Sequence, residues 1–177
     1  MRARKVKELD PHGALADNAA RIVRVRLDEL CSFVPRVFDP AEVEGLHDMR
    51  IAAKRLRYVL EVTLPLFGPY ARDAVGVVKE LQELLGEIHD CDVQLPEVGE
   101  VLADVVRADA GALRGGGAPP HAAAYAGLVG VMVDLRARRD RDFAAFLDRW
   151  RDLERDGFAA RLRYAVTERS LLEPTPG

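Results

Sequence analysis

The sequence predicts an all-α protein, an antiparallel bundle of about five to six helices. Apolar residues recur at intervals of three and four through most of the chain, which is the period of a helix with one buried side. No stretch shows the alternation of apolar and polar residues that a half-buried strand requires. Glycine and proline gather at a few places between the periodic segments, so the helices are expected to reverse through mostly short turns.

The length of the chain favours one domain. Its 177 residues, 49% hydrophobic and 31% charged, are enough for one sizeable core. We therefore expect residues 1–177 to form a single helical domain. Glycine and proline at about residues 108–121 predict a mobile linker, and about residues 170–177 should form a frayed tail.

The first three helices are predicted from their apolar stripes and from the stop signals between them. The first runs from about Leu15 to Phe38, with Pro35 limiting its regularity. Its apolar stripe comprises Leu15, Ala19, Ile22, Leu30, Phe33 and Val37. The second contains residues 46–61 and ends at Gly68-Pro69. The third runs from about Tyr70 to Ile88. Its apolar side comprises Val77, Val78, Leu81, Leu84, Leu85 and Ile88.

Three further helices are expected in the second half of the chain. A short one covers roughly Val93 to Arg107 and follows the segment HDCD of residues 89–92. Beyond the linker, two more run from Ala122 to Trp150 and from Asp152 to Glu168. Their apolar stripe includes Leu128, Met132, Leu135, Phe143, Phe146 and Trp150.

Charge and cysteine content limit the class of protein. The net charge is −3, so a site for a polyanion must be a local patch on a neutral or acidic surface. Cys31 and Cys91 are expected to be reduced thiols, because no secretory signal is visible. No apolar run approaches the length needed to cross a membrane. We expect a cytoplasmic protein that does not enter the membrane.

The segment LHDMRIAAKRLRYVLE, residues 46–61, concentrates positive charge on one helix. A helix turns by about 100° per residue, so Arg50, Lys54 and Arg57 fall within an arc of about 80° beside His47. We call His47, Arg50, Lys54 and Arg57 the basic row. The apolar residues form a second arc about 90° from the first. They are Leu46, Met49, Ala53, Leu56, Leu60 and Leu64. The basic row therefore borders the core, and Arg55 points elsewhere.

Such a row of cations needs compensation. Like charges three and four residues apart destabilise an isolated helix by roughly 0.2–0.5 kcal/mol per pair, and Glu61 can neutralise only the far end. An anion bound by several side chains together would compensate the rest, through the bidentate fork of arginine and the mobile charge of lysine. The alternative is a solvated helix face, with His47 as a structural residue.

The neighbouring helix should bring further charged groups close. If the second and third helices fold back on each other, Lys79 reaches the level of Arg57 and extends the row. Asp90 and Asp92 then approach the start of the row, where either could orient His47 or Arg50. The alternative for both aspartates is to cap the helix that follows.

Two arginines interrupt apolar stripes elsewhere in the chain. Arg26 lies between Ile22 and Leu30, and Arg139 lies between Leu135 and Phe143. A charged group on an inner face needs a partner or an opening to water. Each arginine is therefore a secondary candidate for binding the anion beside the basic row. The alternative is that its side chain extends along the core, so that the guanidinium reaches water at the edge.

No catalytic constellation is visible. The sequence has no glycine-rich phosphate loop, no nucleophile elbow and no HExxH pair. HDCD offers too few ligands at a proper spacing for a structural zinc site. We therefore expect neither enzymatic activity nor a metal or other cofactor. An enzyme acting on phosphate compounds through His47 or a bound metal is the alternative.

The motif LHDMRIAAKRLRYVLEVTLPLFG followed by LQELLGEIHDCDV resembles the CHAD family, the conserved histidine α-helical domain. The resemblance runs from about Leu46 to Val93, and flanking stretches such as RIVRVRLDEL also look similar. It implies an all-helical domain whose basic residues line a groove or pore. It further implies binding of inorganic polyphosphate by His47, Arg50, Lys54, Arg55, Arg57 and Lys79.

The resemblance also suggests a cellular setting. Association with polyphosphate granules and a separate CYTH-type triphosphate-tunnel enzyme as partner are both implied by it. Many relatives contain two related halves that enclose the anion, whereas one copy of the motif is visible here. Either the C-terminal helices supply the second wall, or two chains pair as a homodimer.

The alternative function is an interaction module that accepts an acidic protein segment or nucleic acid in the same groove. Nucleic acid is disfavoured, because no aromatic residues alternate with the cations to stack on bases.

Overall fold

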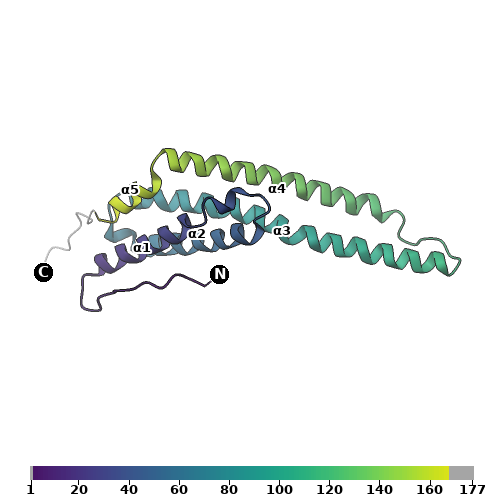
Figure 1. The fold of residues 1–177 in the computed structure, drawn as a ribbon, viewed down its shortest axis with the longest axis horizontal. Coiled ribbons are helices and arrows are strands. Elements are labelled where there is room, and N and C mark those ends of the chain that lie inside the picture. The colour runs from purple at the N-terminus through teal and green to yellow at the C-terminus, as the bar shows by residue number, and fades with distance from the viewer. Residues whose placement is uncertain (1, 168–177) are drawn as a thin grey trace. The chain divides into compact units, whose positions relative to one another are not determined.

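The computed structural model describes residues 2–167, and within that range it contains helices and no strand (Figure 1). The predicted all-α class is confirmed. The expected tail at residues 170–177 lies outside the described residues. The α-helices are α1 (Leu15–Cys31), α2 (Val43–Thr63), α3 (Tyr70–Arg114), α4 (Ala124–Arg155) and α5 (Phe158–Ala165). Two short 3-10 helices, η1 (Arg36–Phe38) and η2 (Leu64–Leu66), flank α2.

The chain divides into two compact units. Unit 1 comprises the residues up to Gly86 and those from Ala145 onward, and unit 2 comprises Glu87–Ala144. Unit 1 therefore holds α1, α2 and α5, together with the start of α3 and the end of α4. Unit 2 holds the remaining parts of α3 and α4, joined by the turn between them.

The core of unit 1 follows the stripe predicted for α2. Five of its residues are almost fully buried, with an exposed fraction of 1% or less, which confirms the prediction. They are Leu46, Met49, Ala53, Leu56 and Leu60. The adjoining stretch of α3 contributes Val78, Leu81 and Leu85, also fully buried. Burial of each such side chain contributes roughly 1.5–3 kcal/mol, so this seam accounts for much of the stability of unit 1.

The buried face of α1 differs from the predicted one. Leu15 was expected inside but is 70% exposed, whereas Val23 and Leu27 are fully buried. Arg26 lies between Val23 and Leu27 in the sequence and is itself buried. The sequence pattern treated Arg26 as an interruption of the stripe, when it marks the centre of the buried face. α1 also ends at Cys31, and the expected continuation to Phe38 is replaced by η1.

The two helices predicted before and after residues 89–92 form one helix. α3 runs without a break from Tyr70 to Arg114 and contains Pro96 in its interior. Proline lacks an N–H and usually kinks or ends a helix, but α3 continues through this position. Since no helix begins after Asp92, the interpretation of Asp90 and Asp92 as capping residues is wrong. The helix also extends into the expected linker as far as Arg114.

The last two helices are divided five to six residues later than predicted. α4 continues to Arg155, and Gly157 then adopts a left-handed backbone conformation with φ of 65° before α5 begins. Glycine reaches this region without a steric penalty, so Gly157 permits the sharp change of direction. Within residues 2–167, no helix combines the length and the apolar character that crossing a membrane requires.

Both cysteines are free thiols with little access to water. Cys91 is 1% exposed in unit 2, and Cys31 is half-buried in unit 1. Burial is the main cause that raises the pKa of each thiol above its ordinary value. Nearby carboxylates, such as Asp142 beside Cys91 and Asp28 beside Cys31, act in the same direction.

Unit 2 is held at its turn by a buried carboxylate. Asp109 on α3 is 3% exposed and accepts hydrogen bonds from the backbone N–H of His121 at 3.0 Å and from the Tyr125 hydroxyl at 2.9 Å. The ring Nδ1 of His121 also lies 2.9 Å from Oδ1 of Asp109. Burial alone would raise the pKa of Asp109, but these hydrogen bonds outweigh it and lower the pKa below its ordinary value. Burial and the bond to Asp109 raise the pKa of Tyr125.

Replacing Asp109 by alanine should open the turn at residues 115–123. Because the folded pKa of Asp109 is lowered, its contribution is complete above pH 4 and is lost as the pH falls through the folded pKa. We expect the hydrogen-exchange protection factor of the His121 amide to fall in Asp109→Ala at neutral pH, and in the wild type only in acid. Asp104→Ala is the control, since Asp104 forms an exposed pair with Arg107. Equal protection in both variants would contradict the prediction.

Candidate polyanion site on helix α2

All four residues of the basic row lie in unit 1, on the side of α2 next to its buried stripe. His47, Arg50 and Arg57 are half-buried, and Lys54 is exposed. Their side chains therefore leave the helix at the edge of the core, as the sequence predicted. Half-buried cations are desolvated in part, so the free energy of binding an anion there is larger than on an open helix face.

Arg50 lies on the seam between α2 and α3. A Cβ atom placed on Gly86 would be 3.6 Å from Nε of Arg50, so the two helices pass each other at this level. The contact confirms the register expected for the hairpin, in which residues equally far from the turn face each other. The same register places Gln82 near the level of Lys54.

Two polar atoms on this seam are buried without a hydrogen-bond partner. They are Nε of Arg50 and Oε1 of Gln82; Nε of Arg57, two turns further along α2, is also buried without a hydrogen-bond partner, although Glu61 lies beside it. Among residues 2–167 no carboxylate forms an ion pair with Arg50. A buried polar group left unsatisfied costs about 1–3 kcal/mol, so native proteins seldom keep one without a use for it. Arg50 is therefore the member of the row whose charge most needs an external anion.

The far end of the row is partly compensated. Arg57 Nε lies 3.3 Å from Oε1 of Glu61, one helical turn away. Lys54 and Arg57 also both lie close to the Tyr58 ring, with Nζ of Lys54 5.7 Å and Cζ of Arg57 4.8 Å from the ring centroid. Cation–π contacts of this kind hold the two cations in place but leave their charge unneutralised.

Lys79 lies on α3 and is 58% exposed at its side chain. Its Nζ is 3.8 Å from Oε1 of Glu83, a loose surface pair that contributes little to stability. The extension of the basic row to Lys79 stays a prediction, as does the groove around it.

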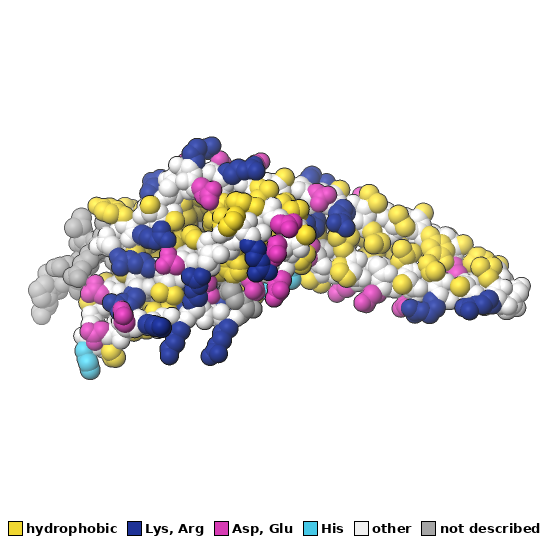
Figure 2. Space-filling view, in the orientation of Figure 1, with side chains coloured by type: hydrophobic (Ala, Val, Ile, Leu, Met, Phe, Trp, Pro, Cys, Tyr) yellow, Lys and Arg dark blue, Asp and Glu magenta, His cyan; other side chains and the backbone are white. Residues whose placement is uncertain are grey.

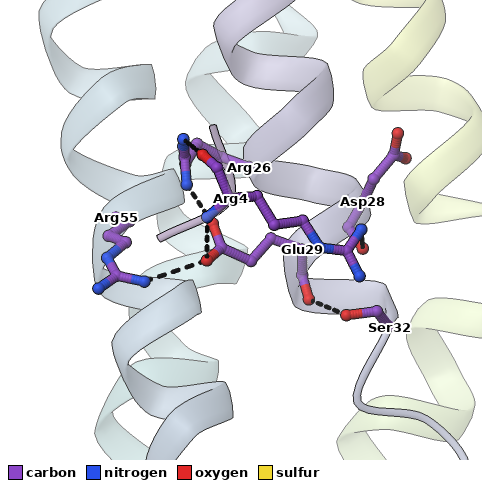
Figure 3. A network of polar contacts seen from close by, with 6 residues as sticks. All are labelled: Arg4, Arg26, Asp28, Glu29, Ser32 and Arg55. Carbon is purple, nitrogen blue, oxygen red and sulfur yellow. Dashed lines mark hydrogen bonds and ion pairs between the residues drawn. The ribbon is translucent and has the colours of Figure 1, made fainter. Parts of the chain in front are cut away.

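Arg55 and Arg26 share one buried carboxylate (Figure 3). Glu29 on α1 has a side chain only 2% exposed, and its Oε1 accepts a hydrogen bond from Arg55 Nη1 at 3.0 Å. Its Oε2 accepts one from Arg26 Nη1, three residues earlier on α1. The backbone N–H of Arg4 also donates to Glu29 at 3.2 Å, and Arg26 donates to the carbonyl of Arg4 at 2.5 Å.

The network around Glu29 explains why α1 and α2 carry arginines at their contact. A charged side chain is tolerated inside only when it is paired and hydrogen-bonded, and Glu29 satisfies both arginines at once. Arg55 was predicted to point away from the basic row, and its pairing with Glu29 on α1 confirms this. A role for Arg26 or Arg55 in binding an anion stays a prediction.

Arg139 and Asp92 form an ion pair within unit 2. Arg139 is 4% exposed, its Nε donates to Oδ1 of Asp92, and its Nη2 lies 3.4 Å from Oδ2. Arg139 therefore has a buried partner of its own, as an inward-facing arginine requires. Asp90 is exposed on α3. The expected orienting role of Asp90 and Asp92 toward the basic row stays a prediction.

Sequence reasoning missed four residues that shape this site. Glu29 and Tyr58 are revealed by their side-chain contacts, Gly86 by its closeness to Arg50, and Gln82 by its buried oxygen without a partner. A signal for Glu29 was present, because it lies three residues after an inward-facing arginine and within the buried face of α1. Gly86 could also have been predicted from the sequence, because the hairpin register places it opposite Arg50.

One cavity in unit 1 lies away from the basic row. It has a volume of about 550 Å³, is bordered by the end of α1, the end of α4 and the start of α5, and includes Cys31, Trp150 and Arg163 in its lining. Arg163 is paired with Asp28 and Trp150 donates to Glu154, so the polar groups there have partners. Among residues 2–167, no three His, Cys, Asp or Glu side chains come together in a way that could hold a metal ion.

The fold and the basic row define an all-helical protein with cations concentrated on one helix that borders the core. A family model described as the CHAD domain matches residues 2–98, which is more than half of the chain. The protein therefore belongs to the CHAD family. The match includes the whole basic row, Lys79, Asp90 and Asp92. No curated protein and no solved structure matches the chain.

Proposed function

We propose that this protein binds inorganic polyphosphate, or a similar phosphate-rich polyanion, through the basic row on α2. The observation that carries the proposal is Arg50, whose half-buried guanidinium has an unsatisfied Nε and no carboxylate partner among residues 2–167. Lys54 follows one turn later and lacks a carboxylate partner in the same range. Arg57 is paired only with the exposed Glu61. Membership of the CHAD family supports the same ligand class.

The chemistry of the row suits a chain of phosphates. Arginine donates a planar fork that matches two phosphate oxygens, and lysine offers a mobile charge that adapts to their spacing. Successive turns of α2 present one cation each, so neighbouring phosphates can be bound by neighbouring turns. Affinity should grow with ligand length and fall steeply with salt, because each phosphate contact releases counterions. The proposal involves no catalytic step.

Titration of polyphosphates of graded length tests the proposal. In Arg50→Ala/Lys54→Ala/Arg57→Ala, the loss of three contacts should flatten the slope of log Kd against log salt concentration by about 2–3 and weaken binding by at least tenfold. The measurement is isothermal calorimetry at two salt concentrations.

A matched control carries the same change of net charge. Arg107→Ala/Arg151→Ala/Arg155→Ala removes three exposed arginines, each paired with an aspartate three residues before it. This control should bind nearly as the wild type does. If both triple variants lose affinity equally, net charge and not the basic row determines binding. If an acidic peptide binds the row more tightly than polyphosphate does, the interaction-module function replaces this one.

A further inference from the structure

The N-terminal segment before α1, residues 2–14, lies in no helix but is fixed to α1 (Figure 1). Its first anchor is the backbone of Arg4, whose N–H donates to Glu29 and whose carbonyl accepts from Arg26 (Figure 3). The guanidinium of Arg4 also donates to the backbone carbonyl of Asp28 at 3.2 Å. The buried network around Glu29 therefore holds the start of the chain in addition to joining α1 and α2.

Two further anchors follow along α1. The backbone carbonyl of Glu8 accepts a hydrogen bond from Arg21. Asp10 and Asn18 exchange two hydrogen bonds, one of 2.9 Å and one of 2.6 Å. The segment therefore runs antiparallel to α1. The ends of chains are usually poorly ordered unless contacts of this kind tie them down, so side chains on this segment are held in place before any ligand binds.

The first part of this segment is strongly basic. Residues 2–7 contain four cations and no acidic residue, although the whole chain has a net charge of −3. We call these four exposed cations the basic strap; they are Arg2, Arg4, Lys5 and Lys7. In Figure 2, Lys and Arg side chains project from the lower edge of unit 1, where Figure 1 draws this segment.

The protein does not compensate the charge of the strap. Within residues 2–167, no carboxylate forms an ion pair with Arg2, Lys5 or Lys7. The nearest carboxylate in the sequence, that of Glu8, lies 3.4 Å from Nη1 of Arg21. The strap is therefore a positively charged surface that is available to an external anion.

The strap begins beside α2, the helix that carries the basic row. Arg4 and Arg55 donate to the same oxygen, Oε1 of Glu29, which places the start of the strap next to the Arg55 side of α2 (Figure 3). Arg55 follows Lys54 of the basic row directly in the sequence. The two side chains are about 100° apart around a helix of about 5–6 Å radius, so the path between them is only about 10 Å long.

No carboxylate interrupts the path from the row to the strap. At the level of Lys54 and Arg55, the residues of α2 that lie between them are Ile51 and Tyr58, neither of which is charged. The acidic residues of α2 lie in its first two turns and in its last one. They are Glu44, Asp48 and Glu61. A polyanion that lies on the basic row can therefore cross the middle of α2 without meeting a negative charge.

We propose that the basic strap is a second contact surface for the same polyphosphate chain, which continues from Lys54 past Arg55 to the strap. The inference rests on the proposed function and extends it, because only a chain long enough to cross α2 gains the additional contacts. Lys5 and Lys7 are exposed on either side of the half-buried Val6. Alternate side chains of an extended backbone point the same way about 7 Å apart, so both lysines can bind one chain.

Polyphosphate fits the strap better than nucleic acid does. Residues 2–14 contain no Phe, Tyr or Trp, so no ring is present beside the cations to stack on bases. An anionic membrane would attract the strap through the same charge, at about 1 kcal/mol per cation. The basic row beside the strap favours polyphosphate, because one flexible chain can bind both surfaces.

Calorimetric titration of the full chain with tripolyphosphate and with long-chain polyphosphate tests the inference. In Arg2→Ala/Lys5→Ala/Lys7→Ala, the strap variant, affinity for the long chain should fall at least tenfold, and the slope of log Kd against log salt concentration should flatten by about 2–3. Affinity for tripolyphosphate should stay that of the wild type, because three phosphates occupy the basic row without reaching the strap. Arg4 is left unchanged, since it anchors the segment.

The control Arg107→Ala/Arg151→Ala/Arg155→Ala carries the same change of net charge and should bind both ligands as the wild type does. Circular dichroism confirms that each variant stays helical. The inference is overturned if the strap variant keeps its affinity for the long chain, if it loses affinity for both ligands equally, or if the control loses as much.

The triple alanine variant of the basic row separates this inference from the proposed function. If the row variant loses both ligands while the strap variant loses neither, the proposed function stands and the strap has no part in it. If only the strap variant loses the long chain, the proposed function fails and the strap binds polyphosphate alone. If the strap variant loses binding only to vesicles of phosphatidylcholine and phosphatidylserine, the strap belongs to a membrane surface instead.

Discussion

Replacing Glu29 by alanine is expected to lower the free energy of unfolding by about 3 kcal/mol. Glu29 is the shared carboxylate partner of Arg26 and Arg55, and its side chain is 2% exposed. Without it, the guanidinium of Arg26, which is 10% exposed, is left without a counter-charge inside the protein. Arg55 is 28% exposed and can turn to water, which is why we take the lower end of the usual range of about 3–5 kcal/mol for breaking a buried ion pair.

Urea denaturation followed by circular dichroism measures this effect. The matched control is Glu42→Ala, which removes a glutamate that accepts from Arg36 at 2.6 Å on the surface and should cost no more than about 1 kcal/mol. A third variant, Arg26→Met/Glu29→Leu/Arg55→Leu, should recover most of the loss, because apolar residues of similar volume remove the unpaired charges. Equal effects of Glu29→Ala and Glu42→Ala would show that the network around Glu29 contributes no more than a surface pair.

Introducing a carboxylate beside Arg50 is expected to weaken polyphosphate binding by about 10- to 100-fold. Gly86→Glu places an acidic side chain on α3 directly opposite Arg50, where it competes with the ligand for the guanidinium. Hydrogen bonds to charged groups contribute about 1.5–3 kcal/mol each, which corresponds to this range of affinity. A Cβ atom at Gly86 meets Nε of Arg50 at an ordinary contact distance of 3.6 Å, so the backbone need not move.

Gly86→Gln is the control for this substitution. It has nearly the same size as Gly86→Glu and no charge, and both replace glycine by a better helix former, so both should fold. We expect Gly86→Gln to keep most of the affinity for polyphosphate, measured by the same calorimetric titration. Equal loss in the two variants would mean that the seam needs space for the ligand and that the charge of Arg50 is not decisive. If neither variant loses affinity for polyphosphate, Arg50 does not contribute to the binding site.

The arrangement of α2 could be predicted from the sequence because it depends on the helical period alone. One continuous helix carries both the apolar stripe from Leu46 to Leu60 and the basic row from His47 to Arg57. The rotation of about 100° per residue therefore predicts which residues share each face. The hairpin register was also predictable from the stop at Gly68-Pro69, and the contact between Arg50 and Gly86 confirms it.

The buried face of α1 could not be predicted in the same way, because a charged residue, Arg26, lies among its apolar residues. Arg26 is inside only because Glu29 and Arg55 accompany it, and one of these lies on another helix. Local patterns contain no information on that partner. The long helix α3 was missed for a different reason: the sequence predicts a break at HDCD, residues 89–92, whereas α3 continues through this segment and through Pro96.

The protonated state of the two thiols has a practical consequence for studying this protein in solution. Thiolates, not thiols, react with maleimides, so the raised pKa values of Cys31 and Cys91 slow the reaction of both groups near neutral pH. One cysteine added on the exposed surface should therefore react first, so a brief reaction attaches a fluorophore mainly at that known position. Energy transfer between two copies labelled in this way would test whether two chains pair.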